Sequence, residues 1–298
     1  MLKKIFFAGM ILLAASCSNE SELNEVINSE KATAPVTVRV NGFSITQEDF
    51  PTGGTRAEQT VASYTDVHAI DLAFYAGETE VYKTTQLRSI SSTYTTFGEF
   101  SCNLPIGTYT MVVVGRGNFD GDVFTLTSPT AAGYTSERAR ETFCATQSVT
   151  VTSTTPLDLE VTLNRIVAML KIISTDNASS GVAKIRTTYG KGSKSFNPTS
   201  GLATDDNGFS LTNTANVMAD GKLGIYSFVF LASNEETMTI TIEALDGSNN
   251  VLFTKVVPNV ALKRNRKTTL SGAIFTANAS SAAFSIETGW LEDNTVNF

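Results

Sequence analysis

Apolar and polar residues alternate with a period of two along much of the chain. Such alternation places one face of a β-strand against a core. In the segment 36–46 the apolar positions of this pattern are Val36, Val38, Val40, Phe43 and Ile45. We therefore predict a core strand over residues 36–46. The dipeptide Asn41-Gly42 is a type I′ turn signal, so a hairpin is the alternative.

Short apolar runs separated by turn signals continue to the end of the chain, and together they predict an all-β fold. Turn residues such as Pro105-Ile106-Gly107 and Asp246-Gly247 connect neighbouring runs. Spacings of about ten residues favour β-sandwiches over a parallel sheet, which requires helical crossovers. Only 135–142 is an exception, with one or two helical turns as an option. The expected strands lie at 67–75, 80–88, 97–104, 108–115, 142–152, 157–164, 166–173, 182–189, 208–213, 224–232, 237–245, 250–257, 267–274 and 282–291.

The length of the chain leaves room for two domains once its first residues are set aside. Of 298 residues, we assign 36–162 to an N-terminal β-sandwich domain and 163–298 to a C-terminal one. No long Pro- or Gly-rich linker separates them. We therefore expect the two domains to share a close interface.

The first residues have the pattern of a targeting segment. Lys3 and Lys4 precede an apolar run over 5–15, which is too short to span a membrane. Small residues then lead into Cys17. We predict a signal peptide over 1–16 and a lipidated Cys17, by resemblance to a bacterial lipobox from which Ala14 departs. Plain secretion with cleavage near Ser16 is the alternative.

A polar, acidic stretch over 17–35 follows the predicted lipidation site. It contains four glutamates before residue 31 and few apolar residues. Such a composition does not bury enough apolar area to fold alone. We interpret it as a tether between the lipid and the folded body, with a neutral spacer as the alternative. Its acidic start resembles the surface-export signals of lipoproteins in some Gram-negative phyla, which implies a lipid held in the outer membrane and a body exposed at the cell surface.

Charge and chemical motifs narrow the function by exclusion. The net charge of −7 argues against a nucleic-acid partner. A basic cluster at 263–267 is interpreted as a solvated or charged strand edge. The single histidine, His68, has no nucleophile motif or zinc-ligand partners around it. The spacing of Asn118, Asp120 and Asp122 lacks the distal glutamate of a calcium loop. We expect no enzyme activity, no cofactor and no metal.

Two cysteines remain after Cys17 is assigned to lipid. Cys102 and Cys144 both fall on predicted strands. An exported protein permits a disulfide between them. The alternative is that both are free and pack as small hydrophobic side chains.

Residues 52–57 offer a glycine-rich segment with one arginine, Arg56, directly before Ala57. Exposed segments of small and polar residues are preferred sites of proteolysis. Cleavage after Arg56 would remove the predicted core strand and leave an open groove. The alternative is an ordinary loop arginine after a first strand.

Four features, in order along the chain, resemble the fimbrillins of type V pili. They are Thr55-Arg56-Ala57, the run Leu163 to Ala168, the run Lys263 to Thr269, and Trp290 near the end. The resemblance implies two tandem transthyretin-like β-sandwich domains and export as a lipoprotein. It also implies that an arginine-specific protease removes 36–56 at Arg56. Assembly with other fimbrial subunits by donor-strand exchange, serving adhesion, would follow. Stalk, anchor and tip subunits all occur in that family.

The end of the chain carries the pattern of a donor strand. Its apolar residues share one parity, which fits strand addition, where alternate side chains fill pockets. The residues are Phe284, Ile286, Trp290, Val296 and Phe298. The alternative is that 282–298 is the last strand of the second domain. A glycan-binding surface lipoprotein is the alternative function, which would require exposed aromatic side chains lining a cleft.

Overall fold

The structure is a computed structural model, and it describes residues 32–46, 56–88, 97–276 and 285–288. The described residues belong to one compact unit. Every regular element in the described residues is a β-strand, so the predicted all-β class is confirmed. The strands are β1 Thr33–Thr46, β2 Arg56–Thr60, β3 Ala69–Ala76, β4 Thr79–Leu87, β5 Glu99–Pro105, β6 Gly107–Arg116, β7 Phe124–Ser128, β8 Ala131–Tyr134, β9 Thr142–Val151, β10 Leu157–Arg165, β11 Ala168–Ser174, β12 Lys184–Tyr189, β13 Ser195–Asn197, β14 Leu202–Ala203, β15 Phe209–Thr214, β16 Gly224–Val229, β17 Glu235–Leu245, β18 Val251–Lys263, β19 Lys267–Gly272 and β20 Ser285–Thr288.

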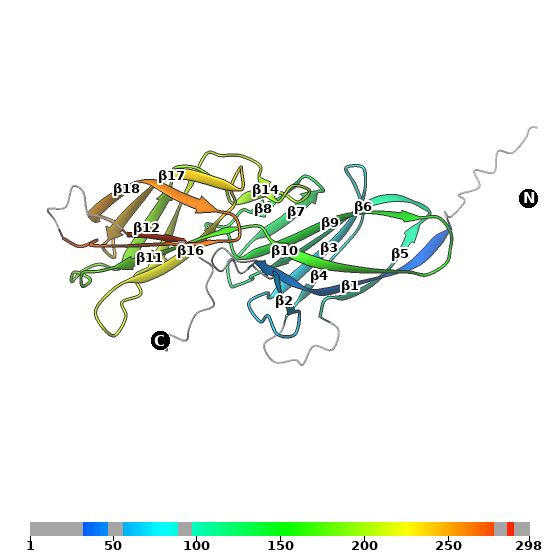
Figure 1. Ribbon diagram of the computed structural model, residues 1–298, viewed down its shortest axis with the longest axis horizontal. Coiled ribbons are helices and arrows are strands. Elements are labelled where there is room, and N and C mark those ends of the chain that lie inside the picture. The colour runs from blue at the N-terminus through cyan, green and yellow to red at the C-terminus, as the bar shows by residue number, and fades with distance from the viewer. Residues whose placement is uncertain (1–31, 47–55, 89–96, 277–284, 289–298) are drawn as a thin grey trace, which may run out of the picture. The chain divides into compact units, whose positions relative to one another are not determined.

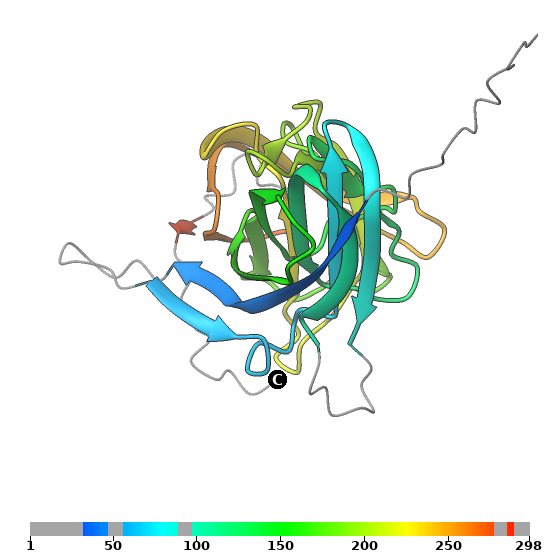
Figure 2. The same ribbon diagram turned by 90° about the vertical axis from the view of Figure 1, so that its right-hand side faces the viewer.

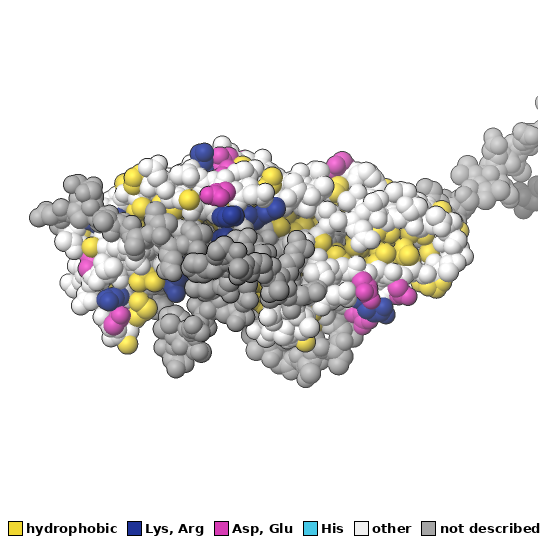
Figure 3. All heavy atoms as spheres, in the orientation of Figure 1, with side chains coloured by type: hydrophobic (Ala, Val, Ile, Leu, Met, Phe, Trp, Pro, Cys, Tyr) yellow, Lys and Arg dark blue, Asp and Glu magenta, His cyan; other side chains and the backbone are white. Residues whose placement is uncertain are grey.

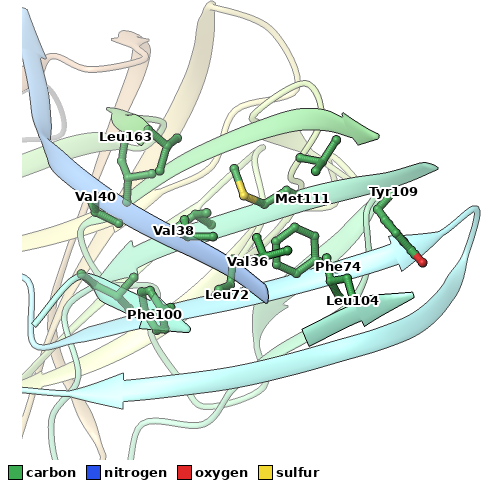
Figure 4. Packing of buried hydrophobic residues seen from close by; sticks show 14 of the residues in the cluster. Val36, Val38, Val40, Leu72, Phe74, Phe100, Leu104, Tyr109, Met111 and Leu163 are labelled. Atoms are coloured by element: carbon green, nitrogen blue, oxygen red, sulfur yellow. The ribbon is translucent and has the colours of Figure 1, made fainter. Parts of the chain in front are cut away.

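The first half of the chain forms an eight-stranded sheet in the order β2-β1-β10-β9-β6-β3-β4, with β5 paired to β1 (Figure 1). This sheet curls so that β1, β5 and β10 lie opposite β3 and β6, and it encloses its own core (Figure 4). All pairings are antiparallel except that of β1 with β10, which is parallel.

Three four-stranded sheets complete the described fold. The orders are β16-β11-β19-β20, β15-β12-β17-β18 and β14-β13-β8-β7. The first two enclose a second core that includes Leu170, Ile240 and Leu270. The third joins β7 and β8 to β13 and β14 across about 60 residues of sequence, through Phe196 opposite Ala132. This sheet was not foreseen from the sequence.

A third cluster of buried side chains connects the two halves of the chain. Strands β3 and β6 are buried on both faces, so Leu72 faces the first core while Ala73 and Tyr75 face the other way. There they pack with side chains from the four-stranded sheet β14-β13-β8-β7 and with Phe230. The predicted boundary between two domains at residue 163 stays a prediction. Strand β13, from the second predicted domain, pairs with β8 of the first, and β14 pairs with β13.

Most expected strands are present, and two local expectations are wrong. Asp246-Gly247 lies in the connection between the antiparallel strands β17 and β18, as predicted. The alternative hairpin at Asn41-Gly42 is absent because β1 runs straight through these residues. Residues 135–142 form no helix; Ala139 instead makes an isolated bridge with Phe228.

Candidate functional site

Strand β1 lies inside the large sheet, with hydrogen-bonded neighbours on both edges. One edge pairs with β10 from Val36 to Ser44. The other edge pairs with β5 over Thr33–Arg39 and then with β2 over Gly42–Thr46. Figure 2 shows β1 in dark to mid blue, with β2 in lighter blue beside its second half. Removal of β1 would therefore leave backbone groups of three strands without partners.

A β-bulge interrupts the alternation of β1. Val40 pairs with Val161 and Gly42 pairs with Thr162, so Asn41 is one extra residue on β1. The bulge explains why buried positions are even-numbered up to Val40 and odd-numbered at Phe43. The sequence predicted one core strand across both runs, with a turn at Asn41-Gly42 as the alternative, and the bulge was not foreseen.

The inward face of β1 is completely enclosed. Figure 4 shows Val36, Val38 and Val40 among side chains from the opposite strands, including Leu72 and Met111. Val36 and Val38 are at most 1% exposed, and Phe43 is fully buried. Burial of each of these large side chains contributes about 1.5–3 kcal/mol, as an upper estimate. Four of the five side chains predicted for the removable strand are therefore core residues, and the fifth, Ile45, is half-buried against the same cluster.

The outward face of β1 is held by charged pairs that were not foreseen from the sequence. Arg39 Nε lies 2.6 Å from Glu99 Oε1 on β5, and Arg39 Nη1 lies 3.7 Å from Asp158 Oδ1 on β10. Glu99 raises the pKa of Arg39 by this hydrogen bond. Asn41 donates to Glu160 Oε2 at 3.2 Å. Exposed pairs contribute little stability each, but they fix the register of β1 against both neighbours.

The end of β1 is packed between aromatic rings. The Phe43 ring lies 4.9 Å from that of Phe143 and 5.6 Å from that of Tyr64, between centroids. A Cβ at Gly115 would come within 2.9 Å of the Phe43 ring. Glycine at this position therefore makes room for Phe43 against β6.

A buried polar cluster lies beside these rings. Arg165 Nε is 2.7 Å from Glu141 Oε1, and the Tyr64 hydroxyl donates to the same carboxylate at 2.8 Å. Arg165 also donates to Asn265 Oδ1 at 3.2 Å, which ties the end of β10 to the β18–β19 turn. Burial raises the pKa of both Tyr64 and Glu141. Arg165 belongs to the run that carried the fimbrillin resemblance, but its partners are far away in sequence.

The structure places the expected cleavage position in a strand rather than in a loop. Arg56 and Ala57 open β2, paired with Thr46 and Ile45 of β1. Residues 52–55 lie outside the described residues. The predicted cleavage position therefore lies directly beside the last residues of the strand predicted to be removed, in the same sheet. Cleavage itself remains a prediction.

The expected donor strand is described only in part. Ser285–Thr288 form β20, which pairs with the edge of β19, with Ile286 opposite Leu270. In this single chain the segment is thus an edge strand of its own sheet, which was the alternative weighed from the sequence. Phe284, Trp290, Val296 and Phe298 lie outside the described residues.

The carboxylate of Asp176 holds the segment that leads towards β20. Asp176 accepts hydrogen bonds from the backbone N–H groups of Ile274 and Phe275, each at 2.8 Å, and from the Thr276 hydroxyl at 2.9 Å. Lys255 Nζ donates to the carbonyl of Thr276 at 2.8 Å. Residues 274–276 are thereby held against the second core.

The disulfide predicted as one option is absent, because Cys102 and Cys144 are both free. Cys144 belongs to the cluster between the two halves, whereas Cys102 packs against the first core. Burial raises the pKa of the Cys102 thiol to about 11 and that of Cys144 to about 12. Cys17 lies outside the described residues.

The other candidate sites do not form a metal-binding or catalytic arrangement of side chains in the described residues. Asp122 is ion-paired with Arg140 at 2.7 Å, which occupies the carboxylate of the proposed calcium spacing. No group of three or more metal-ligating side chains was found there. Burial lowers the pKa of His68, whose ring packs edge-on against Phe119. The described part of the chain contains no helix long and apolar enough to cross a membrane.

Comparison with known proteins places this all-β chain in a family. A model of a family of unknown function, DUF6562, matches residues 33–297, so the chain belongs to that family. No curated protein matches the chain.

Several solved structures from Bacteroides and Porphyromonas species match the chain at low sequence identity. A candidate adhesin from Bacteroides ovatus is 12% identical, with a TM-score of 0.48 over 83% of this chain and 88% of that one. The fimbrial anchor protein Mfa2 from Porphyromonas gingivalis is 11% identical, with a TM-score of 0.48 over 87% and 98%. A candidate polysaccharide-binding protein from Bacteroides thetaiotaomicron is 10% identical, with a TM-score of 0.49 over 87% and 99%.

Proposed function

We propose that this protein is a structural subunit of a cell-surface fimbria that assembles by donor-strand exchange and serves adhesion. The protein is exported as a lipoprotein through Cys17 and is held at the outer membrane until an arginine-specific protease cuts after Arg56. The single observation that carries the proposal is the position of β1. It is an interior strand with both edges paired and an enclosed apolar face, yet it precedes almost all of the fold and ends ten residues before the cut.

The burial of β1 implies that cleavage alone does not release the strand from the fold. Val36, Val38, Val40 and Phe43 together contribute about 6–12 kcal/mol by burial, as an upper estimate. A cut strand with that contribution does not leave by itself under native conditions. A competing strand must replace its hydrogen bonds to β10 and β5 and its side chains in the core. Assembly therefore requires both the cut and a donor, which keeps an uncut subunit monomeric.

The end of the chain is the proposed donor. Strand β20 is four residues long and has one described neighbour, β19. An edge strand of that length is held by few backbone hydrogen bonds, so it exchanges more readily than an interior strand. Its apolar parity continues to Phe298 in the sequence. Other copies of this chain or accessory fimbrial subunits supply or receive the strand.

The test uses two proteases with different specificity at residue 56. Wild-type protein treated with an arginine-specific protease at low dose should give a ladder of oligomers on unboiled gels, and Arg56→Ala should give none. Arg56→Lys is the matched control, because trypsin cuts after lysine while the arginine-specific enzyme does not. Arg56→Lys should therefore polymerise after trypsin treatment and stay monomeric after treatment with the arginine-specific protease.

Deleting residues 283–298 tests the donor separately. The truncated protein should still be cut and should fail to polymerise, while circular dichroism verifies that it folds. Wild-type protein that is cut after Arg56 and stays monomeric would contradict the assembly proposal. Polymerisation of the truncated protein would assign the donor strand to another segment.

A further inference from the structure

A cavity of about 620 Å³ lies where the ends of β9 and β10 meet the β18–β19 turn and the turn that precedes β14. Its volume falls in the range of pockets that hold small organic ligands. Ser44 of β1 forms part of the lining. Figure 3 shows Lys and Arg side chains, in dark blue, gathered on this face near the end of β18.

The lining carries positive charge without any acidic side chain. Of the described residues around the cavity, Arg165, Lys263, Arg264 and Arg266 are cationic, and none is Asp or Glu. Arg165 is already ion-paired with Glu141. Lys263 has Glu235 only at 4.0 Å, and both of these side chains are about half exposed. A concave site lined by one sign of charge concentrates ions of the opposite sign.

Arg264 and Arg266 occupy two different environments at this cavity. Arg264 Nη1 donates to the Ser200 carbonyl at 3.1 Å, which positions its guanidinium beside the cavity while leaving further N–H donors. Arg266 is only 6% exposed, and burial lowers the pKa of its guanidinium. Of the two, Arg264 is therefore the guanidinium that offers donors to an anion.

The remaining lining is rich in groups that hydrogen-bond to hydroxyls. The amides and hydroxyls are those of Ser44, Thr146, Asn164, Thr199, Ser200, Asn234 and Asn265. No aromatic side chain lines the cavity among the described residues, so it lacks the flat surfaces on which neutral sugar rings stack. This lining suits a ligand that combines an anionic group with several hydroxyls.

We infer that the cavity binds a small acidic saccharide, with the carboxylate held by Arg264 and Lys263 at the β18–β19 turn. The amides and hydroxyls of the wall hold the sugar hydroxyls. This site borders β1 through Ser44, and it is complete in the uncut chain, so binding does not depend on strand exchange. The proposed site gives the basic cluster 263–267 a role in recognising an anion. The sequence alone had indicated a solvated or charged strand edge for this cluster.

The test is titration calorimetry on the intact, uncut protein. The probe is a disaccharide of glucuronic acid and glucose, compared with cellobiose, which has a hydroxymethyl group in place of the carboxylate. We expect the acidic disaccharide to bind at least about tenfold more tightly than cellobiose, because only it forms charge-assisted hydrogen bonds. Added sodium chloride should weaken its binding.

The matched variants remove two charges in two places. The double variant Lys263→Gln, Arg264→Gln should lose about tenfold or more in affinity. The control Lys184→Gln, Lys222→Gln removes the same charge at positions that do not line the cavity and should bind as wild type. Thermal unfolding of both double variants verifies their folding. Equal binding of the two disaccharides, no binding of the acidic one, or unchanged binding by the Lys263, Arg264 variant would each overturn the inference.

Discussion

The two thiols differ in burial, and this difference predicts their reactivity. A thiol reacts as its thiolate, so a pKa of about 11 for Cys102 and about 12 for Cys144 leaves little reactive form at pH 8. We expect iodoacetamide to modify both slowly in the native protein at pH 8, with Cys144 the slower. Modification should accelerate as pH rises towards 11. Mass spectrometry of timed samples measures both rates.

Denatured protein is the control for this experiment, since both thiols should then react at the rate of an exposed cysteine. The unreduced protein should also accept two alkyl groups at these positions after denaturation. A Cys102–Cys144 disulfide in unreduced protein would contradict the separate environments that the structure gives them.

Individual residues of the groove were predictable where the pattern was local. The alternation of Val36, Val38 and Val40 identifies a buried face because each residue reports on its immediate neighbours. The cluster of Tyr64, Glu141 and Arg165 was not predictable, because its members are 77 and 101 residues apart. No local pattern brings such distant positions together.

At the scale of elements, Asp176 controls the segment that leads to β20. Replacing it with alanine removes three accepted hydrogen bonds and leaves the N–H groups of Ile274 and Phe275 without that acceptor. We expect Asp176→Ala to lower the free energy of unfolding by about 1–3 kcal/mol. Hydrogen exchange at these two amides should accelerate. Urea unfolding and exchange measured by mass spectrometry provide the two readouts.

Asp120→Ala is the matched control, since Asp120 is an exposed carboxylate in a turn. Its substitution should change stability by less than about 0.5 kcal/mol. Unchanged exchange at Ile274 and Phe275 in Asp176→Ala would show that these amides are protected by the core rather than by the carboxylate.

Long strands were predictable, and short ones were not. Strands such as β10 and β17 contain enough alternating positions to be identified from sequence alone. Strands β13 and β14 have three and two residues, which is too few for a period to be visible. The sheet that they form with β7 and β8 depends on contacts between distant parts of the chain. The bulge at Asn41 was missed for a related reason, because a change of parity looks the same in a bulge and in a turn.

At the scale of the whole folded unit, Phe230 connects the two halves. Its ring stacks on Phe196 with centroids 4.5 Å apart, within the cluster that also buries Ala73 and Val112 of the large sheet. Phe230→Ala should lower the free energy of unfolding by about 3–5 kcal/mol. It should also divide one calorimetric transition into two, because the coupling between the halves is weakened.

Leu211→Ala is the matched control for coupling. Leu211 is buried in the second core and is not part of the connecting cluster. Its loss should lower the transition temperature without separating the transitions. A single transition in Phe230→Ala would show that the halves are coupled through other contacts.

The extra residue at Asn41 limits which strands could take the place of β1. A segment with uninterrupted alternation, aligned with the valine positions, would present polar side chains to the space that Phe43 fills. A segment aligned with Phe43 would instead present polar side chains to the space that Val36 fills. A strand with its own irregularity at the same distance matches both sets of positions. The proposed donor keeps one parity to Phe298, so it matches the valine positions or the Phe43 position in a single register, but not both. The bulge thus makes the position of β1 selective for where a strand changes parity, and not only for its alternation.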